Sequence, residues 1–162
     1  MDADFAGIKN YTLILCVDFD GVIHSYSSGW KGPRNIPDPP VPGAIQFLIE
    51  AQKSFFVHIY SSRSRYFGGR WAMKRWLRRQ YESMCIDFAR ADRTVLDHAL
   101  ESAFADPWAD EVEWSAKRFV AAMKFPLMKP AAFLQIDDRA ITFTGKFPDP
   151  KEFLQFKPWN KR

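Results

Sequence analysis

Apolar and polar positions along the chain follow two patterns, short continuous apolar runs and longer stretches with helical spacing. The clearest apolar runs, at residues 12–17, 55–60 and 132–136, are partly β-branched and end abruptly in polar residues. Runs of this length are typical of strands covered on both faces, as in a parallel sheet. We expect two further short strands near residues 84–88 and 141–144.

Helical spacing occupies the stretches between these runs, at residues 43–53, about 69–81, 94–104 and 110–124. Pro42 suits the start of the first helix, because Pro is favoured in a first helical turn. Strands that alternate with helices indicate a mainly parallel sheet with helices on both faces. The expected fold is therefore α/β, a three-layer Rossmann-like sandwich.

Length and composition are those of one compact domain over residues 1–162. With 162 residues and 47% hydrophobic content, the chain can bury a full core without disulfides. Cys16 and Cys85 lie in apolar surroundings and are expected to be free thiols, which favours a reducing, cytoplasmic setting. No apolar stretch has membrane-spanning length and the first residues lack a signal-peptide pattern, so we expect no membrane partner.

The first apolar run ends in two carboxylates, in the segment Asp18-Phe19-Asp20-Gly21-Val22. Ligand sites of parallel sheets lie beyond the carboxyl ends of the strands. Gly21 allows the backbone to turn at once, so that Asp18 and Asp20 can converge on one pocket. The alternative is an acidic turn that only closes the strand.

The last apolar run ends in the same way, with Asp137-Asp138-Arg139 after Ile136. Two acid-tipped strands in one small domain would gather up to four carboxylates, which cannot all stay ionised without a compensating cation. Oxygen ligands suit Mg²⁺. The alternative is that Asp137 and Asp138 cap a turn and that Arg139 neutralises them.

The middle apolar run ends in hydroxyls and cations, namely Ser61, Ser62, Arg63, Ser64 and Arg65. Such groups bind phosphate. A lysine just before the last run, Lys129, has a flexible stem that could bring an ammonium group to the same pocket.

Taken together, these motifs resemble the haloacid dehalogenase (HAD) superfamily of phosphohydrolases. The segment from Asp18 to Val22 matches the first family motif, Ser61 the second, Lys129 the third, and Ile136-Asp137-Asp138 the fourth. They occur in the family's order and span about residues 12–145. Ser62 could replace Ser61 if the strand runs one residue further, and Lys124 is a weaker substitute for Lys129.

The resemblance implies a two-step phosphoryl transfer through an aspartyl-phosphate. Asp18 would attack phosphorus, and Asp20 would protonate the leaving oxygen and then deprotonate the water. Ser61 and Lys129 would contact the phosphoryl group. Mg²⁺ would be held by the Asp18 carboxylate, the Asp20 main-chain carbonyl and the acidic pair, with Asp138 preferred as direct ligand. The substrate-binding candidates are Gly21, Ser62, Arg63 and Arg65.

Family members often carry a large cap domain that selects the substrate. Residues 23–41 have room only for a small flap rich in Gly and Pro, and residues 90–128 are expected to form two ordinary helices and a linker. We therefore expect a capless or minimally capped member whose open site admits a bulky phosphorylated substrate.

The net charge of +4 and the pI near 9.1 raise the question of a polyanionic partner. Cations crowd the helix expected at 69–81, interleaved with two tryptophans, as Arg70, Trp71, Lys74, Arg75, Trp76, Arg78 and Arg79. Basic groups with aromatic platforms suit single-stranded nucleic acid. The favoured interpretation is nevertheless a solvated helix that packs Met73, Trp76 and Leu77 on the core.

The sequence thus predicts a Mg²⁺-dependent phosphomonoesterase, with nucleotide or nucleic-acid-end phosphates as the leading substrates. The motif pattern also resembles the phosphatase part of polynucleotide kinase-phosphatases. One alternative is a small-metabolite phosphatase, and another is a nucleic-acid-binding protein of the same fold without turnover. The motifs indicate the phosphoryl-transfer chemistry better than they indicate the identity of the substrate, and they do not indicate an oligomeric state.

Overall fold

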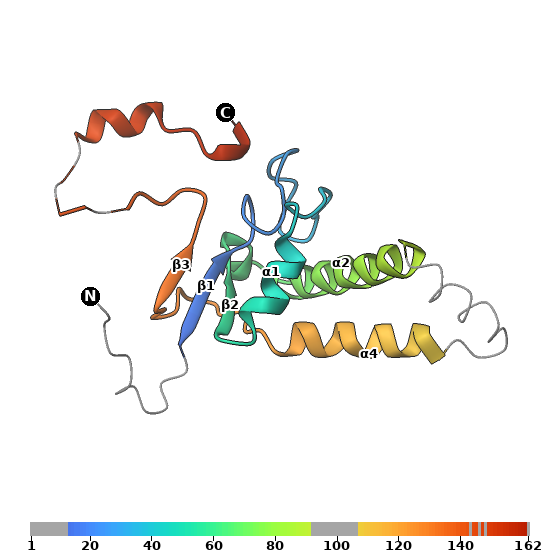
Figure 1. Ribbon diagram of the computed structural model, residues 1–162. Coiled ribbons are helices and arrows are strands. Elements are labelled where there is room, and N and C mark those ends of the chain that lie inside the picture. The colour runs from blue at the N-terminus through green and yellow to red at the C-terminus, as the bar shows by residue number, and fades with distance from the viewer. Residues whose placement is uncertain (1–12, 92–106, 143, 146, 148, 162) are drawn as a thin grey trace, which may run out of the picture.

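The chain forms an α/β fold around a small, open parallel sheet (Figure 1). The computed structural model describes residues 13–91, 107–142, 144–145, 147 and 149–161. The sheet consists of β1 (Ile14–Asp18), β2 (Phe56–Tyr60) and β3 (Leu134–Ile136), in the order β2-β1-β3. Its register sets Val17 opposite Ile59 on one side and Ile136 on the other. The three clearest apolar runs are thus confirmed as parallel strands.

Three α-helices accompany the sheet, α1 (Ala44–Ala51), α2 (Gly69–Ala91) and α4 (Pro107–Ala121). The helices α2 and α4 pack side by side in opposite directions (Figure 1). Short 3-10 helices follow β2 as η1 (Ser62–Arg65) and lie near the end of the chain as η2 (Pro150–Gln155) and η3 (Trp159–Lys161). No described helix is both long enough and apolar enough to span a membrane.

One hydrophobic cluster joins the described helices to the sheet. Its strand residues, Leu15, Val17, Val57 and Ile59, alternate along β1 and β2 and therefore share one face. The helices contribute Ile45 and Leu48 of α1, Met73, Trp76 and Leu77 of α2, and Phe119 of α4 to this cluster. The described helices therefore cover one face of the sheet, whereas the sequence led us to expect helices on both.

The strand expected at residues 84–88 is wrong, because these residues belong to α2. Neither Gly nor Pro interrupts the chain between Arg70 and Ala91, and Tyr81 and Met84 continue the helical stripe that packs on the core. The sheet is extended instead at Lys124, which forms a parallel bridge to His58 through hydrogen bonds with the backbone of Val57 and Ile59.

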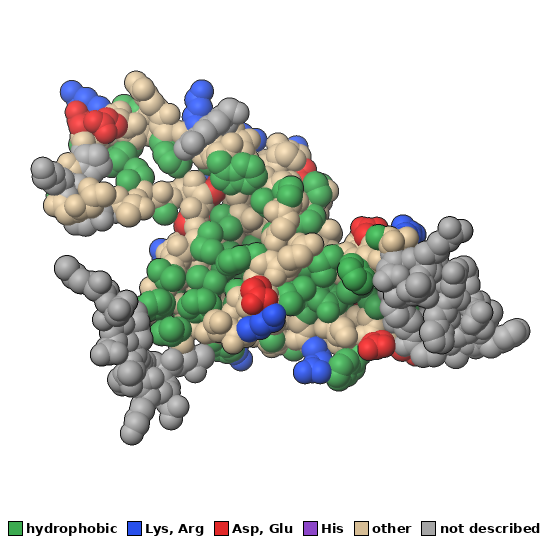
Figure 2. Space-filling view, in the orientation of Figure 1, with side chains coloured by type: hydrophobic (Ala, Val, Ile, Leu, Met, Phe, Trp, Pro, Cys, Tyr) green, Lys and Arg blue, Asp and Glu red, His purple; other side chains and the backbone are tan. Residues whose placement is uncertain are grey.

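Two other expected elements are not seen as such. Residues 141, 142 and 144 are not in a strand, and the helix expected at 94–104 falls outside the described residues. The edge strand β3 is itself poorly covered, with Leu134 exposed by 51% and Ile136 by 36%. Figure 2 shows hydrophobic side chains gathered over this strand region of the face in view.

Candidate functional site

The acid-tipped strands meet at one edge of the sheet. Because β1 and β3 are parallel neighbours, their carboxyl ends lie together and bring Asp18 close to Asp137 and Asp138. One carboxylate oxygen from each of the three residues lies within 4.8 Å of the others. The structure thus gathers three of the four acids that the sequence placed in this site.

Asp138 is the most conspicuous member of this triad. Its side chain is fully buried, and neither carboxylate oxygen has a hydrogen-bond partner among the described residues. The Arg139 Nε atom forms an ion pair with Oδ2 at 3.7 Å, so the neutralising role that the sequence left open for Arg139 applies in part to Asp138. Gly21 has a φ of +92°, and a Cβ at this position would collide with the Asp138 carboxylate, so only glycine admits this approach. A buried carboxylate whose oxygens accept no hydrogen bond is unfavourable, and a further cation bound there would stabilise it.

Asp137 differs from its neighbour because both of its oxygens are engaged. Gln135 Nε2 donates to Oδ2 at 2.8 Å, and the Arg139 backbone N–H donates to Oδ1 at 2.9 Å. The turn-capping role that the sequence left open thus applies to Asp137. Because neither oxygen of Asp138 accepts a hydrogen bond, Asp138 is the better candidate for direct metal contact.

The electrostatics of the triad also favour a bound cation. Burial, together with the charges of Asp137, Asp138 and Asp20, raises the pKa of Asp18 to about 7, although the Phe19 N–H donates to its carboxylate at 2.7 Å. Burial likewise raises the pKa of Asp138. A divalent cation would offset this excess of negative charge, and the all-oxygen donor set fits Mg²⁺.

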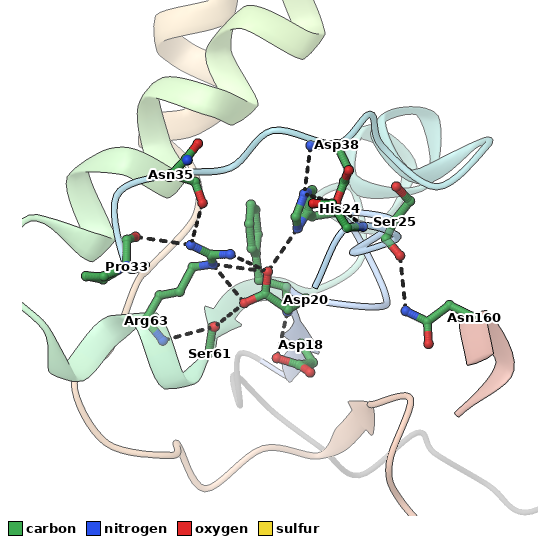
Figure 3. A network of polar contacts seen from close by, with 12 residues as sticks. Asp18, Asp20, His24, Ser25, Pro33, Asn35, Asp38, Ser61, Arg63 and Asn160 are labelled. Carbon is green, nitrogen blue, oxygen red and sulfur yellow. Dashed lines mark hydrogen bonds and ion pairs between the residues drawn. The ribbon is translucent and has the colours of Figure 1, made fainter. Parts of the chain in front are cut away.

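Asp20 belongs to a separate polar network (Figure 3). Arg63 donates from Nε to both carboxylate oxygens, at 3.0 and 2.8 Å, and from Nη2 to Oδ1 at 3.0 Å. His24 Nδ1 lies 2.9 Å from Oδ1, and Ser61 Oγ donates to Oδ2 at 3.4 Å. Burial alone would raise the pKa of Asp20, but the hydrogen bonds from His24 and Arg63 and the Arg63 charge outweigh it and lower the pKa.

Arg63 does not lie where a substrate-binding residue is expected. Its side chain is fully buried, and Nη1 donates to the carbonyls of Gly32, Pro33 and Asn35 at 2.7, 3.2 and 3.1 Å. Its guanidinium also lies 4.7 Å from the centre of the Trp30 ring. Arg63 therefore ties the flap to Asp20, and its assignment as a substrate contact is replaced by a positioning role. The other hydrophilic candidates of this segment, Ser62 and Arg65, are exposed.

His24, which lies just past the first motif, belongs to the same network as Asp20. It is fully buried, and the Asp38 backbone N–H donates to its Nε2 at 3.2 Å. Because Nε2 accepts this hydrogen bond, Nδ1 is the ring atom that donates to Asp20. The rings of Phe19 and Trp76 pack against the imidazole. The only sequence signal for this contact is that His24 follows Asp20 by four positions.

The remaining motif candidates occupy different environments. Ser61 is buried, and its Oγ accepts a hydrogen bond from the Arg63 backbone N–H at 3.2 Å, which caps η1. Lys129 is exposed and forms no ion pair with a described carboxylate. The ammonium of Lys124, the weaker substitute, lies 5.7 Å from the centre of the Phe56 ring rather than at the acids.

The end of the chain returns to the loop that follows β1. Trp159 Nε1 donates to the Gly21 carbonyl at 2.6 Å, Asn160 Nδ2 to the Ser25 carbonyl at 3.1 Å, and Lys161 Nζ to the Ser27 carbonyl at 3.3 Å. Figure 3 shows the Asn160 contact beside the Asp20 network. The described end of the chain therefore adjoins the triad through Gly21.

Comparisons of this chain with protein-family models, with curated proteins and with solved structures find no match. Its function is therefore inferred from the chemistry of the site itself.

Proposed function

We propose that the protein is a Mg²⁺-dependent phosphomonoesterase of the haloacid dehalogenase type that acts through Asp18. The observation that carries this proposal is the convergence of Asp18, Asp137 and Asp138 at the carboxyl ends of neighbouring parallel strands. The buried Asp138 carboxylate supports the same proposal, because neither of its oxygens accepts a hydrogen bond and both suit contact with a cation.

Asp18 is the nucleophile of the proposed reaction. Its carboxylate oxygen forms a bond to phosphorus while the bond from phosphorus to the leaving oxygen breaks, and that oxygen takes up a proton. Water then attacks the aspartyl-phosphate, which releases inorganic phosphate and restores Asp18. A Mg²⁺ ion held by Asp18, Asp137 and Asp138 would screen the repulsion between the carboxylate and the phosphate.

Asp20 is the general acid and base of this scheme, and its surroundings favour one half of that role. The Arg63 pair and the His24 hydrogen bond favour the ionised carboxylate, which is the form that removes a proton from water. Protonation of the leaving oxygen requires the pair with Arg63 to loosen. Because Arg63 also donates to the flap carbonyls, we infer that flap position and the Asp20 proton are linked.

The substrate contacts of the proposal are exposed hydrophilic groups of the second and third motifs. Lys129 supplies a mobile cation for the phosphoryl group, and Ser62 and Arg65 offer a hydroxyl and a second cation after β2. Nucleotide and nucleic-acid-end phosphates are the leading substrates, and a small phosphorylated metabolite is the alternative. A panel of phosphate esters from both classes separates the two.

The first test is phosphate release from a generic aryl phosphate. We expect release with Mg²⁺, none with EDTA, and none from the Asp18→Asn variant. Asp87→Asn is the matched control, because Asp87 is an exposed acid on α2 that pairs only with Arg90 among the described residues. Release that persists in EDTA, or that Asp18→Asn and Asp87→Asn reduce equally, would contradict the proposal.

A further inference from the structure

A basic groove runs between α2 and the C-terminal part of α4. It has a volume of about 810 Å³, and all of its ionisable lining residues are cations. They are Arg70, Lys74, Arg75, Arg78, Lys117 and Lys124. Such a concentration of positive charge in a hollow focuses the field on an anionic ligand. We call this hollow the basic groove.

Most of the charge in the basic groove is not neutralised by the protein. Arg78 pairs with Glu82, and Lys117 pairs with Glu113. The other four cations have no carboxylate partner among the described residues, namely Arg70, Lys74, Arg75 and Lys124. An excess of unpaired cations along one hollow suits a ligand with several phosphates rather than a single carboxylate.

Aromatic rings lie among these cations. Trp71 lines the basic groove, is exposed by 60%, and has the Arg75 guanidinium 5.1 Å from its ring centre. Phe125 lies opposite on the chain after α4, with the Lys74 ammonium 5.2 Å from its ring centre. Trp76, by contrast, is buried in the core. Trp71 is therefore largely free of the core, and an exposed ring between cations suits stacking with a nucleobase.

A second hollow adjoins the basic groove. It has a volume of about 830 Å³, shares Arg70, Trp71 and Lys74 with the basic groove, and is also lined by Arg65 and Tyr66. Arg65 is the last residue of η1, which follows Ser61 directly. The two hollows thus form a cationic and aromatic track from the second motif strand along the N-terminal half of α2.

We propose that this track binds single-stranded nucleic acid and presents its terminal phosphate to the triad. Phosphates contact the unpaired cations and a base stacks on Trp71, which explains why cations and an exposed ring alternate on one face of α2. The presentation of a terminal phosphate rests on the proposed function, whereas binding along the track does not.

Binding is measured first without turnover, by fluorescence anisotropy with a labelled 12-nucleotide oligothymidine that carries no terminal phosphate, in EDTA. We expect the triple variant Arg70→Gln/Lys74→Gln/Arg75→Gln to bind at least 10-fold more weakly. The slope of its log binding constant against log salt concentration should become shallower by about 2, because each lost phosphate contact on a single strand removes about 0.7 from that slope. Trp71→Ala should weaken binding about 5-fold or more and leave the salt slope unchanged.

The matched control is Lys53→Gln/Arg79→Gln/Arg90→Gln, which removes the same number of charges from exposed residues outside both hollows. We expect a change of less than 2-fold. An equal loss in the two triple variants would overturn the proposal, since net charge alone would then explain binding. Tighter binding of a 12-base-pair duplex, or binding to anionic lipid vesicles but not to the oligonucleotide, would overturn it as well.

A second measurement tests presentation of the terminal phosphate. If the aryl phosphate is hydrolysed, phosphorylated oligothymidine should be hydrolysed with a higher kcat/KM, and the triple variant in the track should lose most of that advantage. Oligonucleotide binding without any phosphatase activity would reject the proposed function and keep the binding site. Aryl phosphate hydrolysis without oligonucleotide binding would reject the binding site and keep the proposed function.

Discussion

Replacement of Arg63 by methionine tests whether the buried network around Asp20 holds the flap in place. Methionine fills part of the space of the arginine stem but cannot donate a hydrogen bond. The change leaves the Asp20 carboxylate, exposed by only 11%, without its cation, and it leaves the carbonyls of Gly32, Pro33 and Asn35 without their donor.

The expected loss of unfolding free energy follows from the burial of this ion pair. Breaking a buried ion pair by removing one partner costs about 3–5 kcal/mol, whereas an exposed pair contributes about 0–1 kcal/mol. For a chain of this length, a loss of about 3–5 kcal/mol in unfolding free energy corresponds to a drop in Tm of roughly 6–20 °C. The matched control is Arg65→Met, two positions further on at an exposed residue, which should cost less than about 0.5 kcal/mol.

Urea unfolding of the two variants and the wild type measures these costs. Adding Asp20→Asn to Arg63→Met should recover about 1 kcal/mol or more, because the second change removes the unpaired charge. The pKa of Asp20 is lowered in the folded state, so its stabilising contribution is present above the ordinary pKa near 4 and is lost as the pH falls. The difference between wild type and Arg63→Met should therefore shrink in acid. A cost within 1 kcal/mol of the control would refute the reasoning.

Three further outcomes follow from the site. The pKa of Asp18 is raised to about 7, so in EDTA the Asp18 carboxyl makes a contribution to the wild type that becomes increasingly destabilising as the pH rises from about 4 through 7. Asp18→Asn should therefore unfold at higher urea at pH 8 and should match the wild type below pH 4. The pKa shift corresponds to about 4 kcal/mol of unfolding free energy, of which we expect about 2 kcal/mol because the carboxyl is partly exposed to solvent. A stability difference that does not depend on pH would contradict this. Gly21→Ala should weaken Mg²⁺ binding in calorimetric titration at least 10-fold by displacing Asp138, whereas Gly29→Ala, at a similar positive φ but in open space, should not. Asp20→Asn should lower kcat on the aryl phosphate about 100-fold or more with little change in Mg²⁺ affinity, and unaltered turnover would reject its assigned role.

The parts of the fold that sequence could predict are those with local causes. The runs that became β1, β2 and β3 are apolar, partly β-branched and sharply ended, and parallel pairing alone brings Asp18 to Asp137 and Asp138. Residues 84–88 were misassigned because a short apolar run fits a strand or a helix equally well, and packing of α2 on the core decided the matter.

The Asp20 network could not be predicted for a different reason. The partners of Arg63 are backbone carbonyls of the flap, and backbone acceptors leave no trace in residue identity. The position of Arg63 after a motif strand suggested a phosphate contact, and only the course of the flap turned its guanidinium inward. The bond from His24 to Asp20 depends on the same loop geometry.

The contact between Trp159 and the Gly21 carbonyl has a practical consequence for work with the protein. A purification tag placed shortly after Trp159 would lie near the carboxylate triad, and a run of tag histidines there would compete for a divalent cation that the triad binds. Tags for activity and binding measurements therefore belong at the other end of the chain or should be cleaved before use.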